Sequence, residues 1–148
     1  RPISEFQQTM PCPYRLLVLR VSTPRTELYQ RIDARVLAMR EAGFLDEVAG
    51  LAERWGWDLP LMSTLGYAEM GAHLRGELSL DEATAVMAQH TRNYAKRQLT
   101  WFRAESRVRW LVRRPGAGAA VGDGHESGEE DDRLFTEASD LLRTWVLS

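Results

Sequence analysis

The chain has 148 residues, 44% of them hydrophobic and 27% charged, which is typical of a single globular domain. Nineteen basic and 21 acidic residues give a net charge of −2, which excludes a protein that binds nucleic acid through a strongly basic overall surface. A single cysteine excludes a disulfide framework, and no apolar run approaches the length of a membrane-spanning segment.

The first half of the chain predicts one strand followed by three helices. The near-continuous apolar run 14–21 predicts a strand buried on both faces, as in a parallel sheet. A Thr-Pro pair then predicts a helix over 23–43, with the threonine hydroxyl as its N-terminal cap. Apolar spacing predicts a second helix over 44–55 and a third over 63–74, the third interrupted by two glycines.

The helix predicted over 79–102 carries the most distinctive pattern of the chain. It starts with a capping box, in which Ser79 is followed three residues later by Glu82. The stretch 91–103 then combines four cationic and three aromatic residues in just over three helical turns. Cations suit phosphates and flat rings suit bases, although a solvated charged face over a core stripe is the alternative.

Helical geometry divides these cations between two faces. Arg92, Lys96 and Arg103 fall within roughly 40° of one another and form a cationic ridge. Arg97 falls on the other face, in an apolar stripe that includes Trp101. A cation in such a stripe needs a partner, either a carboxylate in the fold or a phosphate outside it.

The remainder of the chain predicts a short strand over 108–112, a Gly-rich and then acidic flexible linker over 113–132, and an amphipathic helix over 133–148. One or two strands and about five helices make an α/β chain that is mostly helical. We find no Gly-rich phosphate-binding loop and no metal-ligand spacing.

Two further groups of residues are candidates for a binding site. Arg31 and Arg35 lie one turn apart, with Arg35 expected to project into the apolar stripe of its helix and Arg31 to flank it. Together they can grip a pyrophosphate, but an internal salt bridge to Asp33, Asp46 or Glu47 is an equal alternative. Gly66 permits close approach of a ligand and Tyr67 can stack on a base, yet on sequence alone a helix irregularity with Tyr67 in the core is preferred.

Four ordered motifs resemble the tRNA dimethylallyltransferase family. They are RPISEFQ at 1–7, LYQRIDAR at 28–35, LGYAE at 65–69 and TRNYAKRQLTWF at 91–102. The resemblance covers about residues 1–112. It implies the C-terminal part of a P-loop-type α/β fold and the transfer of a dimethylallyl group from dimethylallyl diphosphate to N6 of the adenosine next to the anticodon, at tRNA position 37.

The resemblance also implies roles for individual residues. Arg31 and Arg35 become catalytic candidates, and Arg31 is preferred as the group that supports the diphosphate. Ala68 stands where family members usually carry Lys or Arg, so one backbone contact is expected to be lost. The residues that match tRNA-contacting positions are Gly66, Tyr67, Arg92, Lys96, Arg97, Gln98, Thr100, Trp101 and Arg103.

The implied partners are the tRNA anticodon stem-loop, dimethylallyl diphosphate and the N-terminal half of the same enzyme, which would bind most of the Mg²⁺. We expect a cytoplasmic protein with no membrane contact, monomeric when complete. The chain starts with Arg1 and reads as a piece that is inactive alone. The alternatives are a non-catalytic tRNA-binding module without the phosphate-binding half and a purely helical scaffold, which Arg97 paired inside the fold would favour.

Overall fold

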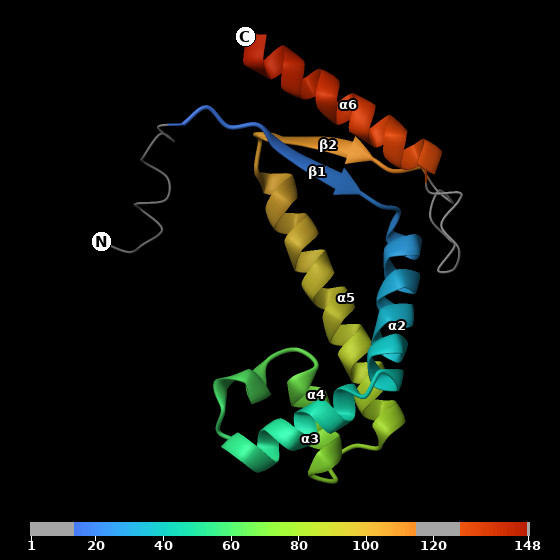
Figure 1. Ribbon diagram of the computed structural model, residues 1–148, viewed down its shortest axis with the longest axis vertical. Coiled ribbons are helices and arrows are strands. Elements are labelled where there is room, and N and C mark those ends of the chain that lie inside the picture. Colours follow the sequence, from blue (N-terminus) through green and yellow to red (C-terminus); the bar gives the residue numbers. More distant parts are fainter. Residues whose placement is uncertain (1–13, 115–127, 148) are drawn as a thin grey trace.

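The computed structural model describes residues 14–114 and 128–147 (Figure 1). In chain order, its elements are β1 (Val18–Ser22), α2 (Arg25–Glu41), α3 (Phe44–Trp55), the 3-10 helix η1 (Pro60–Ser63), α4 (Tyr67–Leu74), α5 (Leu80–Ala104), β2 (Val108–Val112) and α6 (Gly128–Leu147).

The strands β1 and β2 form a parallel pair, with Val18 opposite Val108 and Ser22 opposite Val112. Helix α6 lies along one side of this pair, and α2 and α5 lead away on the other side (Figure 1). At their far ends α3, η1 and α4 form a small helical lobe. The predicted α/β class with mostly helical content is therefore confirmed.

Helix α2 begins one residue later than a cap at Thr23 requires. Pro24 has extended backbone angles and stands at the N-terminal cap, and no side chain caps the helix, so the prediction for Thr23 is wrong. The helix buries Ile32 and Val36. Gly43 follows with φ 91°, a left-handed conformation that favours glycine and turns the chain into α3.

The predicted helix 63–74 is two elements separated by Gly66. The 3-10 helix η1 ends at Ser63 and α4 starts at Tyr67, because Gly66 adopts φ 93°. A Cβ at Gly66 would lie 3.1 Å from Cε of Met87, so the protein's own core fills the space behind this glycine. Gly71, in contrast, lies inside α4 and does not interrupt it.

Helix α5 starts with the predicted capping box. The N–H of Ser79 donates to Glu82 Oε2 at 2.8 Å, and the N–H of Glu82 donates to Ser79 Oγ at 3.2 Å. Only the first half of α5 contributes to the core. The buried residues of that core are Val36, Val48, Ala52, Met62, Met70, Ala83, Met87 and Ala88.

Helix α6 begins at Gly128, so part of the segment predicted as linker is helical, while 115–127 lies outside the described residues. Glu130 accepts the backbone N–H of Arg114 at 2.9 Å, and Arg133 donates to the carbonyl of Val112 at 2.6 Å. With Leu134 buried, these bonds dock α6 on the end of β2.

Candidate functional site

The second half of α5 presents aromatic rings to solvent. Tyr94 is 49% and Trp101 65% exposed, so the apolar stripe that begins in the core continues beyond it. The edge of Trp101 meets the ring of Phe102 at a centroid distance of 4.8 Å. We name Tyr94, Lys96, Arg97, Trp101 and Arg103 the α5 stripe. Exposed rings of this kind can stack on nucleobases.

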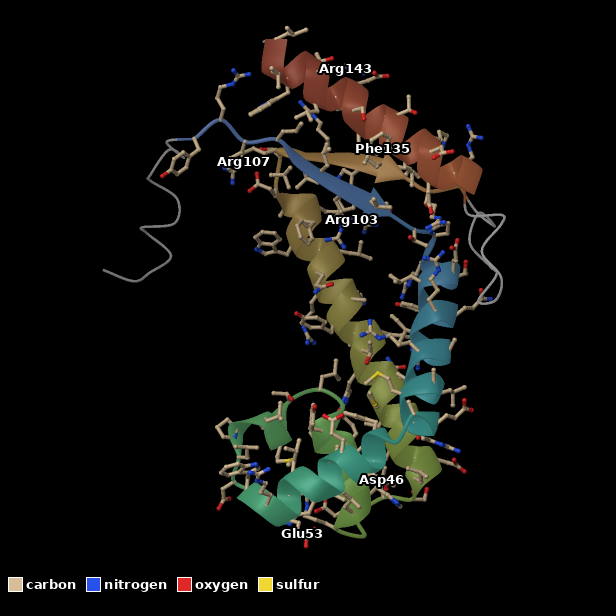
Figure 2. All side chains as sticks on the ribbon, in the orientation of Figure 1. Asp46, Glu53, Arg103, Arg107, Phe135 and Arg143 are labelled. Atoms are coloured by element: carbon tan, nitrogen blue, oxygen red, sulfur yellow. The ribbon has the colours of Figure 1, made fainter. Side chains whose placement is uncertain are left out.

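The cations of the α5 stripe have no acidic partner in the part of the chain that the structure describes. Lys96, Arg97 and Arg103 are exposed, and none of them forms an ion pair with residues 14–114 or 128–147. Arg97 lies 5.7 Å from the centroid of the Tyr94 ring. Figure 2 shows Arg103 at the sheet end of α5, while acidic Asp46 and Glu53 lie on α3 in the distant lobe.

A groove of about 240 Å³ lies between α5 and the segment that joins η1 to α4. The hydroxyl-bearing residues Ser63 and Thr64 line one side, and Asn93, Tyr94 and Arg97 line the other. The groove therefore combines an aromatic ring, a cation with no ion pair to the described residues and several neutral polar groups. These are the groups that bind a nucleotide: the ring for the base, the cation for the phosphate and the polar groups for the base edge.

Glu69 and His90 join the two walls of this groove. Glu69 is 7% exposed, and its Oε1 lies 2.6 Å from Nδ1 of His90. Its Oε2 accepts the backbone N–H of Gly66 at 2.7 Å. Sequence reasoning missed this pair, because the two residues are 21 positions apart and only the place of Glu69 in the LGYAE motif marked it.

Gly66 and Tyr67 stand beside the groove without lining it, whereas their neighbours Leu65 and Ala68 do line it. The Tyr67 hydroxyl donates to Glu47 at 2.5 Å, and this bond, together with burial, raises the pKa of Tyr67. Its ring packs edge-on against Phe44 at 5.1 Å. As the preferred sequence interpretation expects, the helix is irregular at Gly66, and Tyr67 packs partly buried against the core. A role of either residue in tRNA contact stays a prediction.

The predicted cationic ridge is incomplete, because Arg92 is engaged within the fold. Its Nη1 pairs with Asp33 of α2, and its Nη2 donates to Gln89 at 3.0 Å. Gln98 is exposed, and Thr100 donates its hydroxyl hydrogen to the carbonyl of Lys96 at 3.1 Å. Of the ridge residues, Lys96 and Arg103 have no such side-chain partner within 14–114 and 128–147.

The two arginines of α2 lie apart from the groove. Arg31 is half-buried and pairs with the buried Glu27 at 2.6 Å, as the salt-bridge alternative expects, although with a different acid. Arg35 is exposed. Its predicted projection into the apolar stripe is wrong, because the buried line of α2 runs through Ile32 and Val36.

Within 14–114 and 128–147, no three side chains of His, Cys, Asp or Glu gather closely enough to hold a metal ion. The helices in those ranges are also too short or too polar to cross a bilayer.

Comparison with known proteins identifies relatives of the chain. The family model described as IPP transferase matches residues 1–105. A tRNA dimethylallyltransferase of Moorella thermoacetica is 46% identical over 113 residues, covering 74% of this chain and 35% of that protein. One from Syntrophobacter fumaroxidans is 50% identical over 115 residues, covering 75% of this chain and 34% of that protein.

Solved structures agree with the sequence relatives. The full-length tRNA isopentenylpyrophosphate transferase of Bacillus halodurans superposes with a TM-score of 0.70 at 31% identity, covering 98% of this chain and 45% of that one. The tRNA delta(2)-isopentenylpyrophosphate transferase of Staphylococcus epidermidis gives 0.67 at 30% identity, covering 85% and 39%. The chain thus spans about a third of the length of the sequence relatives cited.

Proposed function

The chain belongs to the IPP transferase family, and we propose that it is the later part of a tRNA dimethylallyltransferase, in which it holds the anticodon stem-loop. In the proposed reaction, the N6 amine of the adenosine at position 37 attacks the first carbon of dimethylallyl diphosphate. The bond from that carbon to oxygen breaks, pyrophosphate leaves and the amine loses a proton.

The observation that carries this proposal is the α5 stripe beside the groove. Its cations have no ion pair with the described residues, and its rings remain in solvent. Exposed rings, and cations without an ion pair to the described residues, contribute little to the folded core, but they suit a single-stranded phosphate chain. Removing a base from its stack costs a few kcal/mol, and stacking on a protein ring returns about 1–3 kcal/mol per base.

The reaction also builds negative charge on the departing pyrophosphate, which nearby cations stabilise. We propose Arg31 for this role, with Glu27 holding its guanidinium at 2.6 Å in a fixed direction. Mg²⁺ can also neutralise the diphosphate. We propose that the N-terminal half of the enzyme binds most of this ion.

The proposal includes a cytoplasmic enzyme that is monomeric when complete, with tRNA and dimethylallyl diphosphate as substrates. It also states that the chain alone binds tRNA without turning it over, since its sequence has no Gly-rich phosphate loop.

Two measurements test the proposal. The first is salt-dependent binding of tRNA by the 148-residue chain, with RNA crosslinks mapped to the α5 stripe; binding that avoids α5 contradicts the assignment. The second is prenyl transfer with and without the preceding half of a family member added in trans. Transfer only in the mixture supports the proposed enzyme, transfer by the lone chain refutes its inactivity, and tRNA binding without transfer in either case favours a non-catalytic binding module.

A further inference from the structure

We infer that His90, oriented by Glu69, is a specificity-determining residue that reads the edge of one unpaired nucleobase in the groove between α5 and α4. The inference rests on the proposed function, because it takes RNA as the ligand. It adds which residue recognises the base and which group of the base is recognised.

The Glu69–His90 contact selects the tautomer of the imidazole. A carboxylate only accepts hydrogen bonds, so Nδ1 of His90 must carry the hydrogen that bridges the 2.6 Å to Glu69 Oε1. In the neutral ring Nε2 is then a bare acceptor. The His90 side chain is 53% exposed and lines the groove, and Nε2 has no hydrogen-bond partner among the described residues.

Glu69 is well placed to hold this orientation. It is buried, and its second oxygen is bound to the Gly66 N–H at the start of α4. The carboxylate therefore cannot turn toward the groove without breaking the helix start. The imidazole is fixed by a group that belongs to the fold, as a recognition residue needs to be.

The rest of the groove fits a single base. Its volume of about 240 Å³ is below the roughly 300–1,000 Å³ typical of pockets for larger organic ligands. Tyr94 offers a half-exposed ring for stacking and Arg97 a cation with no ion pair to the described residues for the attached phosphate. His90 lines the same groove, together with Thr64 and Leu65.

An acceptor at Nε2 requires a donor on the base. Adenine, cytosine and guanine present exocyclic amino groups, whereas the donor of uracil is its ring N3–H. We expect the exocyclic amino group to be the donor that Nε2 accepts, and purine riboside, which lacks this group, tests the choice. A neutral hydrogen bond of this kind changes affinity by about two- to tenfold.

The experiment uses anticodon stem-loop RNAs in which each unpaired adenosine is replaced, one at a time, by purine riboside, which lacks the amino group. For the unaltered chain, one replacement should weaken binding by about two- to tenfold. For His90→Ala, that replacement should have no further effect. The matched control is His73→Gln, because Nδ1 of His73 is also bonded, to the carbonyl of Leu78 at 2.9 Å, but His73 does not line the groove.

A second variant, Glu69→Gln, should turn Nε2 of His90 from a hydrogen-bond acceptor into a donor. In Glu69→Gln, the side-chain oxygen can still accept from Gly66, while the amide NH₂ donates to Nδ1 and moves the imidazole hydrogen to Nε2. Nitrogen NMR of His90 should show this change of tautomer. Because Nε2 then donates, purine riboside, whose ring N1 accepts, should no longer bind more weakly than adenosine at that position.

The outcomes separate the two proposals. Absence of tRNA binding by the unaltered chain contradicts the proposed function itself. Binding that does not change with any purine riboside, or a His90→Ala effect equal for every RNA, overturns the inference and leaves the function standing. A tautomer change that leaves purine riboside binding more weakly than adenosine also overturns it.

Discussion

The guanidinium of Arg20 lies 3.9 Å from the centroid of the Phe102 ring, so strand β1 is fastened to the last turn of α5. The centroid of the Trp110 ring in β2 lies 5.4 Å from the same guanidinium. Burial lowers the pKa of Arg20, and its Nε is buried without a hydrogen-bond partner among the described residues. This contact sets where Trp101 and Arg103 stand relative to the sheet.

We expect Arg20→Ala to lower the free energy of unfolding by about 1–2 kcal/mol, because the side-chain packing against both rings is lost. Arg20→Met should cost less. It loses a cation–π contact worth about 0.5–2 kcal/mol but relieves an unsatisfied donor that costs about 1–3 kcal/mol. Urea unfolding followed by tryptophan fluorescence measures both. Equal losses in the two variants would show that the charge, and not the packing, dominates.

Gly66→Ala should destabilise the chain by at least about 2 kcal/mol. Its φ of 93° strains any L-residue, and the new Cβ would lie 3.1 Å from Met87 and 3.3 Å from Phe44. Gly50→Ala is the matched control, because Gly50 lies inside α3 with nothing within 4 Å of its Cβ position. That variant should gain up to about 1 kcal/mol from helix propensity. Thermal unfolding of both variants measures these changes. A Gly66→Ala variant as stable as the unaltered chain contradicts the packing described.

Arg97 and Arg92 lie on the same helix, but we expect substitution of Arg97 to change RNA binding and substitution of Arg92 to change stability. Arg97→Ala should weaken tRNA binding for all sequences and reduce the salt slope by about one, with little change in unfolding, because Arg97 forms no ion pair with the residues that the structure describes. Arg92→Ala should lower the free energy of unfolding and leave tRNA binding little changed, because the ion pair of Arg92 with Asp33 joins α5 to α2. Arg143→Ala is the control on the distant helix α6 (Figure 2). Equal effects of the three variants on binding would exclude a local RNA surface.

Acid should weaken the docking of α6 on β2 through one group, the carboxylate of Glu130. The side chain of Arg133, followed by the backbone N–H of Arg114, lowers the pKa of Glu130 to about 2 from 4.5. A folded-state pKa below the unfolded one gives stability that is complete above about pH 4.5 and lost as the pH falls toward 2. Hydrogen exchange of α6 amides should show this loss.

Glu130→Gln should weaken the docking of α6 already at neutral pH and remove its acid transition. Glu105→Gln is the control, since Arg107 holds the pKa of Glu105 at about 2 as well, but Glu105 lies before β2. An α6 transition that disappears in Glu105→Gln and persists in Glu130→Gln contradicts the assignment.

Local signals in the sequence predicted much of the fold. The Ser79–Glu82 capping box and the apolar spacing of α2, α3 and α5 act within a few residues, so they are readable from one sequence. The start of α6 was missed, because acidic residues after Gly128 resemble a linker as much as a first helical turn. Only their bonds to β2 distinguish the two.

The candidate site was only partly predictable. The sequence marked Arg97 and Trp101 by composition, and both are exposed as a binding role requires. It did not show that Arg92 is occupied by Asp33, nor that Glu69 meets His90. Those pairings join residues 59 and 21 positions apart, and only the packing of α2 and α4 on α5 determines them.

Helix α5 links the core of the lobe to the α5 stripe without a glycine or a proline along its 25 residues, about 37 Å. The helix therefore fixes both the distance and the rotation angle between the residues along it. Removing one residue between His90 and Lys96 would rotate Trp101 by about 100° relative to the groove. Inserting seven would keep its direction within about 20° but move it by about 10 Å. The distance between the groove and the sheet is thus set by the count of residues in one helix.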